Sequence, residues 1–307
     1  MSSSRIVAVI GATGQQGLSV IRKVLEDKTF TPRALTRDPS SATSKQIQEQ
    51  GAEVVKADTR DKVSLVDALR GSEALFIVTL SGYPPYSADK PSEVTIGKNI
   101  VDAAKEAGVR FIVFSSGPGL TKLTGGKYSK VSFYDDKAQV EEYLKASGIL
   151  NASLHLGTFT ENMWTQGTLK KNETGTLTLS VPFFTASDIN GFTWVGHDVG
   201  EATLALLKNY ETKSDDISGR AYPVVTANIS HGEFAAIISK VLGKEVTFIT
   251  APPIGHPNYD EMFEAAREYQ GFYISTPVPN PELTGLGAKF GTIEEFVQTE
   301  IKKRFSD

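Results

Sequence analysis

A glycine-rich stretch near the N-terminus constrains the fold of this chain more than any other feature. Residues 5–17 read RIVAVIGATGQQG, with five consecutive apolar residues, Ile6–Ile10, ahead of glycines at 11, 14 and 17. Such a run is typical of a strand that is buried on both faces of a parallel sheet. Glycines at three-residue spacing let the backbone turn sharply into a helix and approach a ligand closely. The free N–H groups and the dipole of that helix suit a pyrophosphate, so the stretch predicts a dinucleotide site.

The residues after the glycines favour this interpretation over a tight strand–helix turn that binds no ligand. They provide an apolar stripe at helical spacing: Val20, Ile21, Val24 and Leu25. A strand before the glycines and a helix after them are the context that such a motif requires.

Dinucleotide folds select NAD or NADP at the end of the second strand. An acidic side chain there accepts hydrogen bonds from the ribose hydroxyls, whereas an arginine accommodates the 2′-phosphate of NADP. Residues 31–37 predict this strand, and Arg37 ends it about 20 residues after the glycines. Because a guanidinium is planar and donates two parallel hydrogen bonds to phosphate, we expect NADP(H) as the cofactor. Asp38 weakens this signal, and a surface arginine without a ligand is the alternative.

Strand and helix patterns alternate through the first half of the chain. Further strands are predicted at 53–57, 74–80, 110–115 and 152–156, and a helix at 135–147. Five strand–helix units predict an α/β fold, a doubly wound parallel sheet of the Rossmann type. We expect residues 1–157 to form the NADP(H)-binding domain, with later segments at about 190–225 returning to it. Residues 158–307 are predicted to form a smaller α+β domain that makes one wall of a cleft.

Three patterns in the second half predict helix starts of the capping-box type. In each, a short polar residue is followed three positions later by a glutamate that can bond back to it. The pairs are Asp198 with Glu201, Ser230 with Glu233, and Thr292 with Glu295.

Composition narrows the classes of function. The chain has 32 basic and 36 acidic residues, a net charge of −4 and a pI of about 5.7, which disfavours direct nucleic-acid binding. It has no cysteine, which excludes disulfides and thiolate chemistry, and its four histidines lack the spacing of metal ligands, so no metal site is predicted. Neither a signal peptide nor a membrane-spanning run is recognisable. We therefore expect a cytoplasmic protein, with the nucleus as an alternative location.

Several motifs together resemble the NmrA-like family, specifically its HSCARG (NmrA-like domain protein) branch, among the atypical short-chain dehydrogenases/reductases. The matching stretches are GATGQQG at 11–17, LTRDP at 35–39, GAEVVKAD at 51–58, LFIVT at 75–79, DKAQVEEY at 136–143 and FTENM at 159–163. The likeness covers nearly the whole chain and is strongest in its first half. It implies a Rossmann domain that binds NADP(H).

The resemblance also implies which residues hold this cofactor. The pyrophosphate contacts come from the glycine turn: Gly11, Thr13, Gly14, Gln15, Gln16 and Gly17. Arg37 faces the 2′-phosphate, and Asp58 and Thr59 face the adenine. The nicotinamide side is formed by Thr79, Leu80, Lys137, Phe159 and Asn162. Lys98, on a predicted helix, is a further candidate for a phosphate or ribose contact, and a solvated lysine is the alternative.

The catalytic dyad of typical short-chain dehydrogenases is absent. These enzymes use Tyr-x-x-x-Lys, in which the lysine lowers the pKa of the tyrosine so that its hydroxyl exchanges a proton with the substrate. Here Phe133 stands four residues before Lys137, and Tyr134 stands three before it, on a different helical face from that arrangement.

Two functions therefore remain open. The favoured hypothesis is a redox-sensing regulator that binds NADP(H) and signals to a protein partner, a transcriptional regulator or signalling protein, with a homodimer as one form. The alternative is an NADPH-dependent reductase of a small aromatic or unsaturated carbonyl compound. Its proton would come from Lys137, Tyr134, a loop tyrosine (Tyr83 or Tyr86) or water. Aromatic residues that could line a flat substrate, or simply belong to the core, are Tyr83, Tyr134, Phe159 and Trp164.

Overall fold

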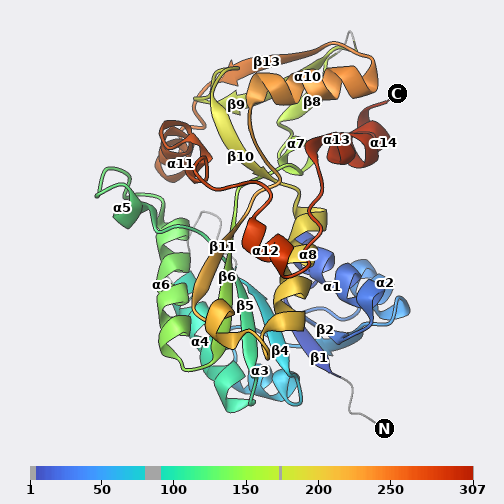
Figure 1. Ribbon diagram of the computed structural model, residues 1–307, viewed down its shortest axis with the longest axis vertical. Coiled ribbons are helices and arrows are strands. Elements are labelled where there is room, and N and C mark those ends of the chain that lie inside the picture. The colour runs from blue at the N-terminus through green and yellow to red at the C-terminus, as the bar shows by residue number, and fades with distance from the viewer. Residues whose placement is uncertain (1–4, 80–90, 173–174, 307) are drawn as a thin grey trace.

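A seven-stranded parallel sheet with helices on both faces forms the lower half of the molecule in Figure 1. The computed structural model describes residues 5–79, 91–172 and 175–306. The strands lie in the order β11-β6-β5-β4-β1-β2-β3, so the order reverses between β1 and β4. They are β1 Ile6–Ile10, β2 Thr31–Thr36, β3 Glu53–Lys56, β4 Ala74–Val78, β5 Phe111–Ser116, β6 Leu150–Leu156 and β11 Arg220–Val224. The predicted doubly wound Rossmann arrangement is confirmed.

Alternate strand residues enter two separate cores, which explains the unbroken apolar runs. Val7 and Val9 of β1 pack with three helices: α1 (Gln15–Asp27), α2 (Ala42–Glu49) and α8 (Val195–Asn209). Ala8 and Ile10 pack on the other face with α3 (Lys62–Leu69), α4 (Glu93–Glu106) and α6 (Ser132–Ala146). A strand covered on both sides is apolar at every position.

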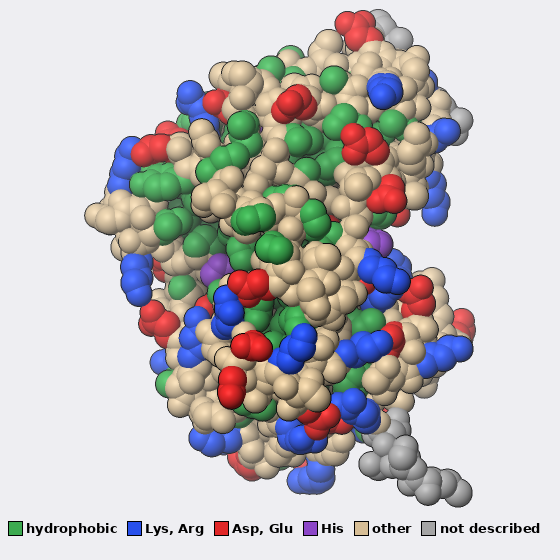
Figure 2. All heavy atoms as spheres, viewed as in Figure 1, with side chains coloured by type: hydrophobic (Ala, Val, Ile, Leu, Met, Phe, Trp, Pro, Cys, Tyr) green, Lys and Arg blue, Asp and Glu red, His purple; other side chains and the backbone are tan. Residues whose placement is uncertain are grey.

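A smaller lobe lies at the opposite end from the N-terminus (Figure 1). It contains two three-stranded sheets, β12-β10-β7 and β13-β9-β8. Its strands are β7 Thr158–Phe159, β8 Leu169–Lys171, β9 Leu177–Pro182, β10 Ile189–Thr193, β12 Ala227–Ser230 and β13 Val246–Ala251. The helices of the lobe and of the segments that join it to the large sheet are α7 Asn162–Thr165, α10 His231–Leu242, α11 Pro257–Glu268, η1 Gln270–Phe272, α12 Pro281–Gly285, α13 Ile293–Phe296, η2 Val297–Ile301 and α14 Lys302–Phe305. A short helix between α8 and β11, α9 Ser214–Ile217, packs with the large sheet. Figure 2 shows hydrophobic side chains gathered on this upper half and charged ones crowding the lower half.

Two of the three predicted capping boxes are present, and one prediction is wrong. Ser230 with Glu233 opens α10, and Thr292 with Glu295 opens α13. Asp198 caps nothing, because α8 begins at Val195 and Asp198 is fully buried in its first turn.

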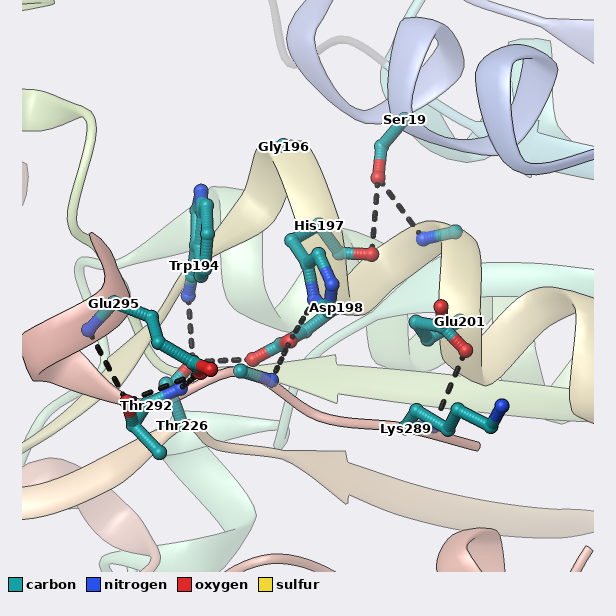
Figure 3. Close-up of polar contacts among 12 residues, drawn as sticks. Ser19, Trp194, Gly196, His197, Asp198, Glu201, Thr226, Lys289, Thr292 and Glu295 are labelled. Carbon is teal, nitrogen blue, oxygen red and sulfur yellow. Dashed lines mark hydrogen bonds and ion pairs between the residues drawn. The ribbon is translucent and has the colours of Figure 1, made fainter. Parts of the chain in front are cut away.

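The Asp198 carboxylate instead joins α8 to distant segments (Figure 3). It accepts hydrogen bonds from the Thr226 hydroxyl at 2.5 Å and from the Gly291 N–H at 2.9 Å. On the opposite side of α8, the Gly200 N–H donates to the Ser19 hydroxyl of α1 at 3.0 Å. Helix α8 therefore connects the segment around Gly291 to helix α1, which follows the glycine turn.

Other differences concern element boundaries. The helix predicted at 135–147 is α6 (Ser132–Ala146), and the strand predicted at 152–156 begins at Leu150. A short helix that was not predicted, α5 (Leu120–Leu123), follows β5, and Asp135 accepts hydrogen bonds there from both the N–H and the hydroxyl of Thr121. The domain boundary between residues 157 and 158 stays a prediction. Helix α8 and strand β11, which come later in the chain, pack with the large sheet.

Within the described ranges, no helix is long and apolar enough to pass through a bilayer. In the same ranges no three acidic or histidine side chains gather as a metal site.

Candidate active site

The glycine turn after β1 has the geometry of an anion site. Gly11 has a φ of +76°, and a Cβ added there would lie 2.3 Å from Val78 Cγ1. A Cβ at Gly17 would lie 2.2 Å from the carbonyl oxygen of Gly11, so α1 can pack against the turn only without a side chain. Gly14 is the N-cap of α1, no described side chain caps this end, and its first turn carries no acidic residue. The first N–H groups of α1 are therefore available to a negatively charged ligand.

Arg37 lies just beyond the carboxyl end of β2. It is exposed and makes no ion pair with any other described residue. Asp58, after β3, is bound by Arg60 at 2.6 Å, and the Arg60 guanidinium lowers the pKa of Asp58 to about 2. Ser40 donates its N–H and its hydroxyl to Asp38, which lowers the pKa of that carboxyl, so Asp38 is an anion beside Arg37.

A buried ion pair joins α4, α6 and the end of β4. Lys137 Nζ donates to the Thr79 carbonyl oxygen at 3.0 Å, to the Thr79 hydroxyl at 3.1 Å and to Glu93 Oε1. The Thr79 hydroxyl in turn donates to Glu93 Oε1 at 2.5 Å. The Glu93 side chain is 1% exposed, and its second oxygen has no hydrogen-bond partner among the described residues. Since an ammonium has three N–H donors, Lys137 is fully engaged by these groups.

An apolar cavity of about 590 Å³ extends from this cluster into the smaller lobe. Its near end is formed by Gln16 of α1, residues 115–117 at the carboxyl end of β5, and Tyr134 and Lys137 of α6. Aromatic side chains form much of the remaining wall, among them Phe133, Phe159, Phe184, Phe192 and Phe272. The Tyr134 hydroxyl makes no hydrogen bond to any described residue, and burial raises the pKa of Tyr134 to about 12. At neutral pH it is therefore a protonated donor beside the cavity.

The structure brings some predicted site residues together and separates others. Five of them line the one cavity: Gln16, Tyr134, Lys137, Phe159 and Asn162. Tyr134 and Lys137 both line the cavity from the first half of α6, although Tyr134 does not occupy the position four residues before the lysine. Lys98 lies on the surface of α4, over the Tyr143 ring at 5.2 Å. Trp164 does not line the cavity and instead stacks on Phe296 in the core of the smaller lobe.

Some predictions fall on residues that the structure does not describe. Leu80, Tyr83 and Tyr86 all lie in 80–90, outside the described ranges.

Sequence reasoning missed Glu93. It follows Ser92, whose hydroxyl caps α4 by accepting from the Thr95 N–H at 3.2 Å. An acidic residue in the first turn of a helix is ordinary helix-start chemistry, so the sequence carries no signal that Glu93 is buried against Lys137.

Fold and site together define a class of protein: a Rossmann-type domain whose glycine turn suits an anionic ligand, with an apolar cavity that extends from it into a smaller lobe. The sequence model of the NmrA-like family matches residues 3–297. The chain belongs to the NmrA-like family.

Comparisons with individual proteins agree with this assignment. An NmrA-like family domain-containing oxidoreductase of Penicillium ochrochloron is 28% identical over 302 residues, which cover 91% of this chain and 89% of that protein. A second oxidoreductase of this description, from Cladobotryum sp, is 41% identical over 144 residues, or 47% of this chain and 43% of the relative.

Two solved structures show the same fold. The negative transcriptional regulator NmrA in complex with NADP has a TM-score of 0.80 at 21% identity, covering 99% of this chain and 97% of that one. An NADPH-dependent quinone oxidoreductase from Escherichia coli, complexed with NADPH, has a TM-score of 0.69 at 23% identity, covering 95% and 98%.

Proposed function

We propose that this chain is an NADPH-dependent reductase of a flat, uncharged carbonyl compound. The observation that supports this most is the cavity of about 590 Å³, whose walls are apolar and aromatic and whose near end holds the unbonded hydroxyl of Tyr134. Enclosed apolar cavities with a few convergent polar groups are the usual form of small-molecule sites.

The glycine turn and Arg37 fit NADP(H). The uncapped N-terminus of α1 suits the pyrophosphate, and the exposed guanidinium of Arg37 makes no ion pair with a described residue. Asp38, the acidic residue next to Arg37 at the end of β2, already accepts hydrogen bonds from the N–H and the hydroxyl of Ser40. When bound, NADPH supplies the hydride for the reduction.

The residues of this chain then have separate roles. Tyr134 donates a proton to the oxygen of the reduced carbonyl and regains it from water. Lys137, with its three N–H groups already engaged, holds the start of α6 against the end of β4 and Glu93. Phe159 and Asn162 line the cavity from the smaller lobe, where they exclude water from the reacting groups.

The comparisons support an oxidoreductase without identifying a substrate. Relatives that match most of the chain are named oxidoreductases, and the Escherichia coli neighbour is an NADPH-dependent quinone oxidoreductase. Quinones are flat, uncharged carbonyl compounds of the kind that aromatic walls bind.

The test is NADPH oxidation with quinones, enones and aldehydes, followed by the loss of NADPH absorbance. We expect turnover of at least one class, and Tyr134→Phe should lower kcat about 100-fold with little change in KM, because general acid catalysis contributes on this scale. Tyr143→Phe is the matched control. It lies on the same helix, but its hydroxyl bonds to Asp102 at 2.7 Å, away from the cavity.

Binding of NADPH with no turnover of any of these compounds would overturn the reductase. The redox-sensing regulator with a protein partner would then be the remaining hypothesis. Equal loss of kcat in Tyr134→Phe and Tyr143→Phe would remove Tyr134 from the mechanism.

A further inference from the structure

The cavity adjoins a second hollow in the smaller lobe. This second hollow is a groove of about 450 Å³. The two share four residues of their walls, Gln166, Thr168, Ile254 and Phe263, so they meet along one rim.

Strand β9 separates the cavity from the groove. Its residues Leu179 and Val181 line the cavity. Thr178 and Ser180, on the opposite face of the same strand, line the groove. Because successive strand residues point to opposite faces, the groove follows the outer face of the β13-β9-β8 sheet.

The rim and the groove expose large apolar side chains. Ile254 on the rim is 54% exposed, and Ile249 in the groove is 50% exposed. Pro182, Ala251 and Phe263 also line the groove, so its apolar side chains are grouped and not scattered. Grouped apolar side chains at the surface mark ligand-binding grooves.

The charges of the cavity and the groove favour an uncharged occupant. Lys137 is the only lysine or arginine among the described residues that line the cavity, and it is paired with Glu93. His231 in the same wall is neutral at pH 7, because burial lowers its pKa to about 4. In the groove, Lys170 is the single charged side chain among the described lining residues.

We propose that the substrate is an elongated molecule with a flat carbonyl-bearing ring and an apolar tail. The ring lies near Tyr134, and the tail crosses the rim at Ile254 and lies in the groove over Ile249. This inference rests on the proposed reductase function, and it deepens that function by assigning the class of substrate. A single ring would leave much of the cavity empty, since volumes of roughly 300–1,000 Å³ hold drug-sized ligands.

The test uses a series of 1,4-benzoquinones that share one ring and carry no tail, a butyl tail or an octyl tail. Binding is measured without NADPH by quenching of tryptophan fluorescence, and turnover is measured separately with NADPH. Each methylene that leaves water strengthens binding by up to about fourfold. We therefore expect Kd to fall at least tenfold from the tailless to the octyl compound.

Three variants distinguish binding of the tail in the groove from its unspecific adsorption elsewhere on the surface. Ile249→Asp should remove most of the gain from the tail and leave Kd for the tailless quinone unchanged, because Ile249 lines the groove and not the cavity. Ile254→Asp, on the shared rim, should also remove most of the gain from the tail. Val63→Asp is the matched control, because Val63 is 71% exposed on α3, away from the groove. Thermal unfolding of each variant checks that it is folded.

The outcomes separate this inference from the proposed function. Turnover of the tailless quinone with no effect of tail length overturns the elongated substrate and leaves the reductase standing. A gain from the tail that persists equally in all three variants also overturns it. A third outcome is that Ile249→Asp and Ile254→Asp abolish the gain from the tail and no quinone is turned over. This outcome supports binding of the tail in the groove and overturns the proposed reductase activity.

Discussion

Separating Lys137 from Glu93 should destabilise the protein strongly, and removing both charges should cost less than the sum of the single changes. Removing one partner of a buried ion pair costs roughly 3–5 kcal/mol, because the other charge is left without compensation. The exposures of the two side chains, 20% for Lys137 and 1% for Glu93, place the two changes at different ends of that range. We expect Glu93→Gln to cost about 3 kcal/mol, since water can reach the ammonium, and Lys137→Met about 4–5 kcal/mol, since it leaves a buried carboxylate.

The double variant Glu93→Gln/Lys137→Met contains neither charge. We expect its loss of stability to fall below the sum of the two single losses by about 1–3 kcal/mol, the usual range for residues in direct contact. The free energy of unfolding is measured in urea by circular dichroism and by tryptophan fluorescence, whose transitions must coincide for a two-state analysis. Lys122→Met, at a side chain that is 91% exposed, is the control and should change stability by less than about 0.5 kcal/mol. Additive single losses would refute the coupling of Lys137 to Glu93.

Three further predictions concern the cofactor and the buried histidine. Gly17→Ala places a Cβ 2.2 Å from the Gly11 carbonyl oxygen, so it should cost about 1–3 kcal/mol of stability and weaken NADPH binding in calorimetry. Arg37→Ala should weaken NADPH about tenfold or more while NADH changes little, because one charge-assisted contact contributes about 1.5–3 kcal/mol; equal affinities before and after would refute the 2′-phosphate role. Burial holds the pKa of His231 at about 4, below its ordinary value of 6.5. The neutral imidazole therefore contributes fully to the free energy of unfolding above pH 6.5, and this contribution is lost as the pH falls toward 4. When the pH is lowered from 6.5 to 4, the free energy of unfolding of His231→Gln, measured in urea titrations, should fall by about 3 kcal/mol less than that of the parent protein.

The part of the fold that local sequence encodes was predictable. The apolar runs of the first strands and the glycine turn depend on residues that are only a few positions apart in the chain. Their alternation specifies a sheet that is covered on both faces. Ser230 and Thr292 were identified for the same reason, because a capping box is complete within four residues.

The features that escaped prediction depend on partners far away in the chain. Asp198 has the spacing of a helix start, yet its hydrogen bonds come from Thr226 and Gly291, 28 and 93 residues away. Glu93 is buried only because Lys137, 44 residues on, folds against it. The cavity likewise joins the start of α6 to side chains of β9, β10 and α11, which no local pattern connects.

The start of α6 also bears on how the proposed reductase would work without the usual Tyr-x-x-x-Lys dyad. Within a long helix, moving a side chain by one position rotates it by about 100°, to another face. Phe133 and Tyr134 instead lie in the first turn of α6, and both line the cavity, with ring centroids 5.5 Å apart.

Lys137 cannot activate Tyr134 as the lysine of the dyad does, because its ammonium is engaged by Glu93 and Thr79. Accordingly the pKa of Tyr134 is raised to about 12 by burial instead of being lowered. If Tyr134 is the proton donor, kcat should show no tyrosine ionisation through neutral pH and should fall only as the pH approaches this value. A fall in kcat with an apparent pKa near neutrality that disappears in Tyr134→Phe would show that Tyr134 is activated after all, and that the Lys137–Glu93 pair opens during turnover.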